Sequence, residues 1–136
     1  MNLQFDGELL TVSITVIFRG SLLHIDNVII DTGSSHTILT PDVLETIGVI
    51  YENGDPVYEA YGIGGSAPFY TKVMDELRIG PYVLTNHKID VGILPKHHNG
   101  LLGLDILMHN GFMIDFHQLI LEHSHQSSLM KKKSSF

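Results

Sequence analysis

The residues best suited to chemistry lie in one stretch, Val28–Ser35, where three apolar residues lead into Asp31-Thr32-Gly33 and two serines. A buried strand that ends in this way delivers a carboxylate to a turn at the edge of a core. Gly33 allows a tight turn and the close approach of a second segment, and the hydroxyls of Thr32 and Ser34 can satisfy nearby polar groups. The stretch therefore predicts either a reactive carboxylate or an ordinary Asx-type turn.

Other candidate groups fit chemistry less well. His36 follows Asp31 by five residues across a turn, and such residues rarely converge; the chain has no Gly-x-Ser-x-Gly motif either. The pairs His97-His98 and His123/His125 lack a third ligand at a suitable spacing. We expect no metal site and no cofactor.

Composition excludes several classes of protein. The chain has 136 residues, 43% hydrophobic and 17% charged, which indicates one globular domain. It has no cysteine, so disulfides, thiolate metal sites and cysteine nucleophiles are excluded. Its formal charge of -7 disfavours nucleic-acid binding. The amino terminus lacks the positive region of a secretory signal, and no apolar run has the length of a membrane span, so we expect a cytoplasmic protein without membrane contact.

The elements that must position the carboxylate read mostly as strands. Leu9–Phe18 and Leu22–Ile30 form a predicted hairpin that runs into the acid stretch. A short strand at His36–Leu39 precedes a helix with Thr40 at its N-cap, Pro41 at its first position and Gly48 at its end. The remaining predicted strands are 57–61, one or two within 69–79, 82–94, a buried strand ending at 101–103, and a hairpin of 112–116 and 119–121, with a second short helix from Asp105 to about Asn110.

A glycine-rich turn, Gly62–Gly65, joins two of these strands. A hairpin with such a tip can close over a substrate and exclude water, although glycine turns are also common in plain hairpins. No lysine follows as in a phosphate-binding loop.

Three stretches, VIIDTGSS, YGIGG and GLLGLDIL, occur in this order and spacing, and together they resemble the retropepsin-like (retroviral-type) aspartic proteases and their single-domain cellular relatives. The resemblance covers about residues 9–122. It implies an all-β fold, a small closed barrel that forms half of an acid protease, with one or two short helices. We accordingly expect one domain at residues 1–122 and a polar tail at 123–136.

The resemblance also implies roles for individual residues. Asp31 corresponds to the catalytic acid, and Thr32 to the threonine that locks the two active-site loops of a dimer. The catalytic set is Asp31, Thr32 and Gly33. The flap that covers the substrate is Tyr61, Gly62, Ile63, Gly64 and Gly65. The residues that support the acid loop are Ser34, Leu101, Leu102 and Gly103.

Some features depart from the viral pattern. Ser34-Ser35-His36 stands where viral enzymes prefer small and then acidic residues. The helix from Pro41 is additional and looks more like the cellular relatives, and the C-terminal tail is polar where viral dimers use a terminal strand.

One carboxylate is not enough for the implied reaction. Peptide hydrolysis without a covalent intermediate needs a base that activates water and an acid that protonates the substrate, and two carboxylates that share one proton supply both. Asp105 lies at a helix start, where capping is its natural role, and Asp115 at a hairpin end. The second acid is therefore expected from a second copy, in a two-fold homodimer that cleaves peptide substrates.

Two alternatives stay open at this point. The same fold can serve as a non-catalytic module that binds peptides or assembles with them. A histidine-bound metal hydrolase would rest on nine scattered histidines without a metal motif.

Overall fold

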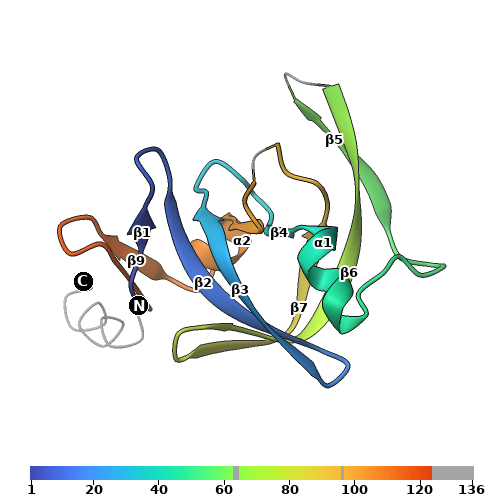
Figure 1. Cartoon of the computed structure of the whole chain (residues 1–136), viewed down its shortest axis with the longest axis horizontal. Coiled ribbons are helices and arrows are strands. Elements are labelled where there is room, and N and C mark those ends of the chain that lie inside the picture. Colours follow the sequence, from blue (N-terminus) through green and yellow to red (C-terminus); the bar gives the residue numbers. More distant parts are fainter. Residues whose placement is uncertain (63–64, 96, 124–136) are drawn as a thin grey trace, which may run out of the picture.

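The computed structural model describes residues 1–62, 65–95 and 97–123, and strands dominate it (Figure 1). The strands are β1 Gln4–Phe5, β2 Leu10–Phe18, β3 Ser21–Ile30, β4 Ile38–Leu39, β5 Val57–Gly62, β6 Gly65–Ile79, β7 Tyr82–Val91, β8 Gly100–Leu102, β9 Phe112–Asp115 and β10 Ile120–His123. The helical segments are α1 Pro41–Leu44, a 3-10 turn η1 Glu45–Ile47, and α2 Leu104–Leu107.

Six strands close into a barrel. The sheet runs β1-β2-β3-β8-β4-β7-β6-β5, and an additional pairing of β2 with β6 joins its two sides. The largely alternating burial along β2 places its apolar residues inside this ring. The prediction of a closed all-β barrel with one or two short helices is confirmed. The largest fully buried core side chains are Ile14, Ile25, Leu39, Leu44, Met74, Leu77, Ile79, Ile89, Leu102, Ile106 and Leu121.

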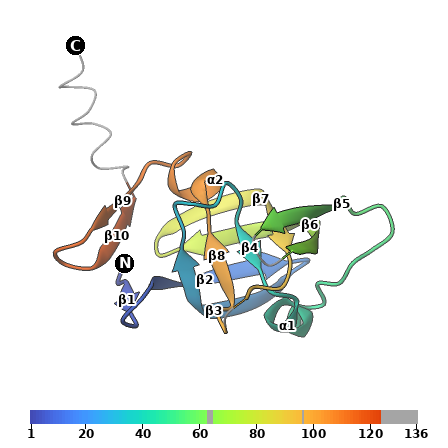
Figure 2. The same cartoon turned by 90° about the horizontal axis from the view of Figure 1, so that it is seen from above.

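The short strands β4 and β8 lie in the middle of the barrel wall, between β3 and β7 (Figure 2). Ile30 pairs with Leu102 in parallel register, and Ile38 pairs with Leu101 in antiparallel register. The segment between β3 and β4 therefore begins and ends beside the same strand. This register brings the Asp-Thr-Gly turn next to Leu101-Leu102-Gly103.

The β5–β6 hairpin extends beyond the barrel (Figure 1). Its two strands pair from Val57 with Tyr70 up to Gly62 with Gly65. β5 is the end strand of the sheet. The second half of β6, from Tyr70 onward, pairs with β7, and part of it also pairs with β2. The predicted tip residues Ile63 and Gly64 lie outside the described residues.

The first helical segment follows its predicted start and stop residues, whereas α2 ends at Leu107, before the predicted end near Asn110. Thr40 occupies the N-cap of α1 in extended conformation, although its side chain makes no capping hydrogen bond. Gly48 ends η1 with φ 82°, a left-handed conformation that favours glycine. The predicted helix is thus one turn of α-helix followed by a 3-10 turn.

The two ends of the described chain pair with each other. The amide of Leu3 donates to the carbonyl of Leu119, and Met1 exchanges hydrogen bonds with Leu121. The N-terminal residues therefore extend the β9–β10 hairpin within the same chain (Figure 2). Sequence reasoning missed this pairing and the two-residue strand β1.

Candidate active site

Asp31 lies at the end of β3, in a turn that the barrel wall holds on both sides. Its amide donates to the carbonyl of Leu102 at 3.0 Å, so the backbone is fixed to β8. The amide of Gly33 donates to Oδ1 of Asp31 at 2.9 Å. The side chain is half-buried. A carboxylate with one oxygen held by the turn and partial access to solvent can bind and polarise a water molecule.

The acid loop comprises residues Asp31–His36, and its members differ in exposure and contacts. A Cβ atom on Gly33 would stand 3.2 Å from Oδ1 of Asp31, which is a tight contact. Thr32 is exposed. The hydroxyl of Ser34 donates to the carbonyl of His36 at 2.7 Å, and its carbonyl accepts from the amide of Leu104 at 2.8 Å. The structure thus places Ser34 as a connection between the acid loop and α2.

Gly103 packs against the acid loop so closely that no side chain fits there. A Cβ atom at this position would stand 2.5 Å from the carbonyl oxygen of His36 and 2.9 Å from its nitrogen. Leu101 and Leu102 are buried on either side of the contact with β3 and β4. Three of the four predicted supporting residues, Leu101, Leu102 and Gly103, therefore lie directly beside the acid loop, and the fourth, Ser34, belongs to it.

Sequence reasoning missed a buried polar network beneath this loop. The Thr37 hydroxyl, whose residue is 1% exposed, donates to Oδ1 of Asp105 at 2.8 Å and accepts from the amide of Gly103 at 3.1 Å. Nε2 of His87 lies 3.5 Å from Oδ2 of Asp105. Burial opposes ionisation of Asp105, but the His87 ring and the Thr37 hydroxyl outweigh it and lower the pKa of Asp105.

The expected capping role of Asp105 is therefore wrong. Gly103 is the N-cap of α2, and no side chain caps this helix. The carboxylate instead joins the end of the acid loop to α2 and β7. Asp115, by contrast, accepts the amides of His117 and Gln118 at 2.9 Å each, as expected of a turn residue.

The base of the β5–β6 hairpin, the predicted flap hairpin, is held by a second group of charged residues. Lys72 on β6 is 4% exposed, and its Nζ lies 2.6 Å from Glu52 and 2.7 Å from Asp55. Burial alone would lower the pKa of Lys72, but the two carboxylates raise it. Arg19 and Lys72 together lower the pKa of Glu52 to about 2. The turn at residues 52–55 is thus bound to the lower part of the hairpin.

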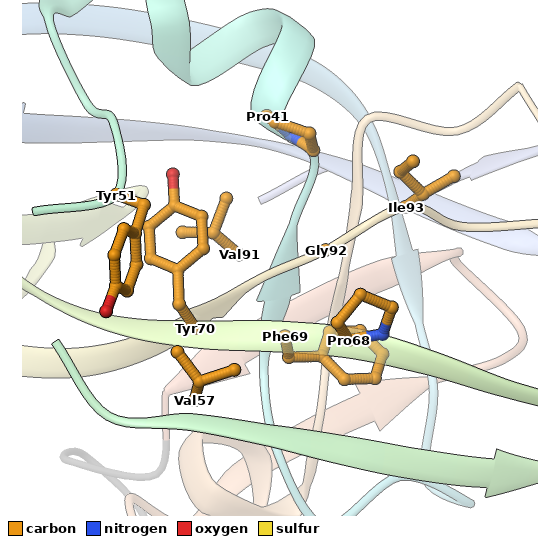
Figure 3. A pocket seen from close by; sticks show the side chains of 9 residues that line it. All are labelled: Pro41, Tyr51, Val57, Pro68, Phe69, Tyr70, Val91, Gly92 and Ile93. Atoms are coloured by element: carbon orange, nitrogen blue, oxygen red, sulfur yellow. The ribbon is translucent and has the colours of Figure 1, made fainter.

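An apolar hollow of about 390 Å³ lies at the base of this hairpin, beside the end of β7 and the start of α1 (Figure 3). The Tyr51 ring packs edge-on against Tyr70, with centroids 5.6 Å apart. Phe69 fills the space above Gly92, where a Cβ atom would stand 2.0 Å from the ring. No residue of the acid loop lines this hollow. Its lining residues are Pro41, Tyr51, Val57, Pro68, Phe69, Tyr70, Val91, Gly92 and Ile93.

Of the predicted flap residues, Tyr61, Gly62 and Gly65 belong to the paired arms, and Ile63 and Gly64 lie outside the described residues. Within the described ranges, no three histidine or acidic side chains gather as a metal site would require. In the same ranges, no helix is long and apolar enough to cross a membrane.

Comparisons with known proteins agree with this geometry. The family model described as aspartyl protease matches residues 14–106, so the chain belongs to the aspartyl protease family. Among solved structures, the chain is similar to a retropepsin-like aspartic protease from Rickettsia conorii, with a TM-score of 0.65 and 20% sequence identity. That match covers 88% of this chain and 93% of the other, and it shows the retropepsin-like fold. No curated protein matches the sequence significantly.

Proposed function

We propose that the protein is a homodimeric aspartic endopeptidase in which the Asp31 carboxylates of two copies meet on a two-fold axis. The family and the fold support hydrolysis of peptide bonds. The single observation that carries the proposal is the acid loop, in which Asp31 stands half-buried beside Gly33, Leu102 and Gly103.

The surroundings of the other inward-lying acids support the need for a second copy. Asp105 is bound to Thr37 and lies beside His87, and Asp90 is buried between β4 and β6. Within the described part of the chain, neither carboxylate is hydrogen-bonded to that of Asp31. A second chain then supplies the partner of Asp31, as symmetry requires of an isologous dimer.

The proposed reaction uses two carboxylates that share one proton, because two adjacent negative charges are unfavourable. The ionised carboxylate takes a proton from water as the water oxygen attacks the peptide carbonyl carbon. The protonated carboxylate gives its proton to the carbonyl oxygen. The tetrahedral intermediate then collapses and the C–N bond breaks. The amine nitrogen receives a proton from the carboxylate that accepted one, while a hydroxyl of the intermediate returns its proton to the other carboxylate, which restores the singly protonated pair.

The substrate would lie extended between the acid loops and the two flap hairpins. Extended peptides pair with strand backbones, so the flap arms would contribute main-chain hydrogen bonds and exclude water. Thr32, which is exposed, would contact the partner's acid loop.

The test is digestion of a mixed peptide library by the purified protein and by Asp31→Asn. We expect cleavage at defined sites by the wild type, and a loss of kcat of about 10³-fold or more in the variant, because the pair loses its base. Sedimentation should show the same dimer for both. A peptide with a tetrahedral secondary alcohol in place of the scissile amide should inhibit the wild type, as a transition-state analogue does.

The result that overturns the proposal is a wild type that binds library peptides and cuts none between acidic and neutral pH. That outcome would favour a peptide-binding module of the same fold. If Asp31→Asn cleaves peptides as fast as the wild type, Asp31 is not the catalytic acid.

A further inference from the structure

A buried carboxylate outside the acid loop lies where the flap hairpin meets the barrel. Asp90 on β7 is 6% exposed. An ionised group in such a place is costly unless polar partners surround it. The partners of Asp90 come from three different segments of the chain.

Two of these partners connect β6 and the acid loop. The Thr71 hydroxyl, opposite Asp90 in the β6–β7 register, donates to Oδ1 at 3.5 Å. Nδ1 of His36, the last residue of the acid loop, lies 3.8 Å from Oδ2. The amide of Asp90 also donates to the carbonyl of Thr37 at 2.9 Å. Both the backbone and the side chain of Asp90 thus contact the end of the acid loop.

The third partner stands on the arm of the flap hairpin. Tyr58 on β5 pairs with Phe69, which lies two residues before Thr71 on β6, so the Tyr58 side chain lies on the same face of the sheet as Thr71 and Asp90 and near the Asp90 carboxylate. Burial, followed by this contact with Asp90, raises the pKa of Tyr58, and the charge of Asp105 adds to the effect. The Tyr58 ring also lies against Phe69, with centroids 6.1 Å apart. One carboxylate therefore faces both the flap arm and the acid loop.

We propose that Asp90 is a positioning residue whose carboxylate, through Tyr58, Thr71 and His36, sets the flap arm at a fixed place relative to the acid loop. This inference rests on the proposed proteolytic function. It assigns to Asp90 the alignment of the substrate channel, without contact to the substrate.

The side-chain contacts of Asp90 are too long to stabilise the fold strongly. At 3.5 and 3.8 Å, the side-chain contacts are long, and hydrogen bonds weaken beyond their usual range. Replacement of a buried charge by a neutral group of the same shape is often neutral for stability or stabilising. We therefore expect Asp90 to contribute more to the alignment of the hairpin than to the stability of the fold.

The experiment compares Asp90→Asn, Tyr58→Phe and their double variant in the dimeric protein. Asp75→Asn is the matched control, because Asp75 is an exposed carboxylate on β6. Tyr82→Phe is the second control, because its hydroxyl binds Asn110 away from the flap arm. Each protein is measured for kcat and KM on a cleaved peptide, for its thermal midpoint, and for amide hydrogen exchange.

We expect Asp90→Asn and Tyr58→Phe each to raise KM about three- to fivefold with kcat within about twofold, since each change removes contacts that are weaker than a full hydrogen bond to a charged group. The thermal midpoint should stay unchanged. The double variant should resemble the single ones, because both remove the same link. Exchange should accelerate in residues 57–62 and 34–38 and stay constant in β2.

An unchanged KM, or a rise in KM with a matching fall in the thermal midpoint, would overturn the inference. If the wild type cleaves nothing, the proposed function fails. Amide hydrogen exchange then tests separately whether Asp90 links the hairpin to the acid loop. Faster exchange in both segments would still support the link, and unchanged exchange in Asp90→Asn would refute it.

Discussion

The acid loop and the flap hairpin are built in opposite ways. The acid loop is short, and β8, α2 and β7 hold it through backbone hydrogen bonds, the Gly103 contact and the Thr37 network. The flap hairpin is long, and its outer strand β5 pairs with β6 alone among the described strands. Its described attachments to the barrel are the Lys72 cluster, the Asp90 cluster and the contacts around the apolar hollow.

This difference in attachment indicates how substitutions in the two regions should affect activity and stability. A reacting group must keep its geometry, and a displacement of about 1 Å can cost about 100-fold in rate. In the proposed function the β5–β6 hairpin would open for substrate and close again, and such a motion requires weaker attachments. We therefore expect changes in the acid loop to lower both stability and kcat, and changes at the flap base to act mainly on stability or KM.

The largest effect of a small substitution should come from Gly103→Ala. A methyl group there would stand 2.5 Å from the His36 carbonyl oxygen, so the acid loop must move. We expect a loss of about 3 kcal/mol in unfolding free energy and about 100-fold in kcat. Ser35→Ala, at an exposed position of the same loop, is the control. Wild-type kcat in Gly103→Ala would contradict the rigid-loop account.

Thr37→Val should be the next most damaging. The change keeps the shape but leaves the Gly103 amide without its acceptor and Asp105 without its donor. Denaturant unfolding should show a loss of about 2 kcal/mol, with kcat reduced as well. Thr46→Val is the matched control, since the Thr46 hydroxyl serves only an exposed carbonyl and should cost under about 1 kcal/mol. Equal losses in the two variants would speak against the network.

At the flap base, Lys72→Met should destabilise without changing kcat. The substitution removes the buried ammonium and leaves Glu52 and Asp55, which retain contact with solvent. We expect a loss of about 1–2 kcal/mol, below the cost of breaking a fully buried pair. Lys88→Met, at an exposed position of β7, should cost almost nothing. A fall in kcat as large as that of Thr37→Val would erase the distinction between the two regions.

The smallest effect should be a change in pH dependence. The folded pKa of Glu52 is about 2, against an ordinary value of 4.5, because Arg19 and Lys72 favour its ionised form. A depressed acid contributes stability that is present above about 4.5 and lost as pH falls toward 2. Urea midpoints across this window should fall less steeply in Glu52→Gln. If the urea midpoint depends on pH equally in wild type and variant, Glu52 does not contribute to the acid sensitivity of the fold.

Much of this arrangement could be predicted from local sequence. Val28–Ile30 before Asp31 gave a strand and an acid loop, and the order of the three motifs gave the barrel. Thr40, Pro41 and Gly48 marked the helical segment. These features depend on neighbours in the chain, where propensity and turn chemistry act.

The parts that could not be predicted depend on partners far apart in sequence. Thr37 and Asp105 are 68 positions apart, so Asp105 was assigned to its own helix start. The link of Lys72 to Glu52 and the contact of Asp90 with His36 arise only when the barrel closes. The cytoplasmic location, the division at residue 122 and the roles of the site residues stay predictions.

The most direct test of the central claim is a subunit-mixing titration. Wild type and Asp31→Asn are mixed after reversible dissociation, and peptide cleavage is measured at a constant amount of wild type. If each active unit needs Asp31 from both copies, an equal amount of variant should reduce cleavage to about half, and a ninefold excess to about a tenth. Cleavage that stays constant as the variant is added, although mixed dimers form, would contradict the paired-acid account.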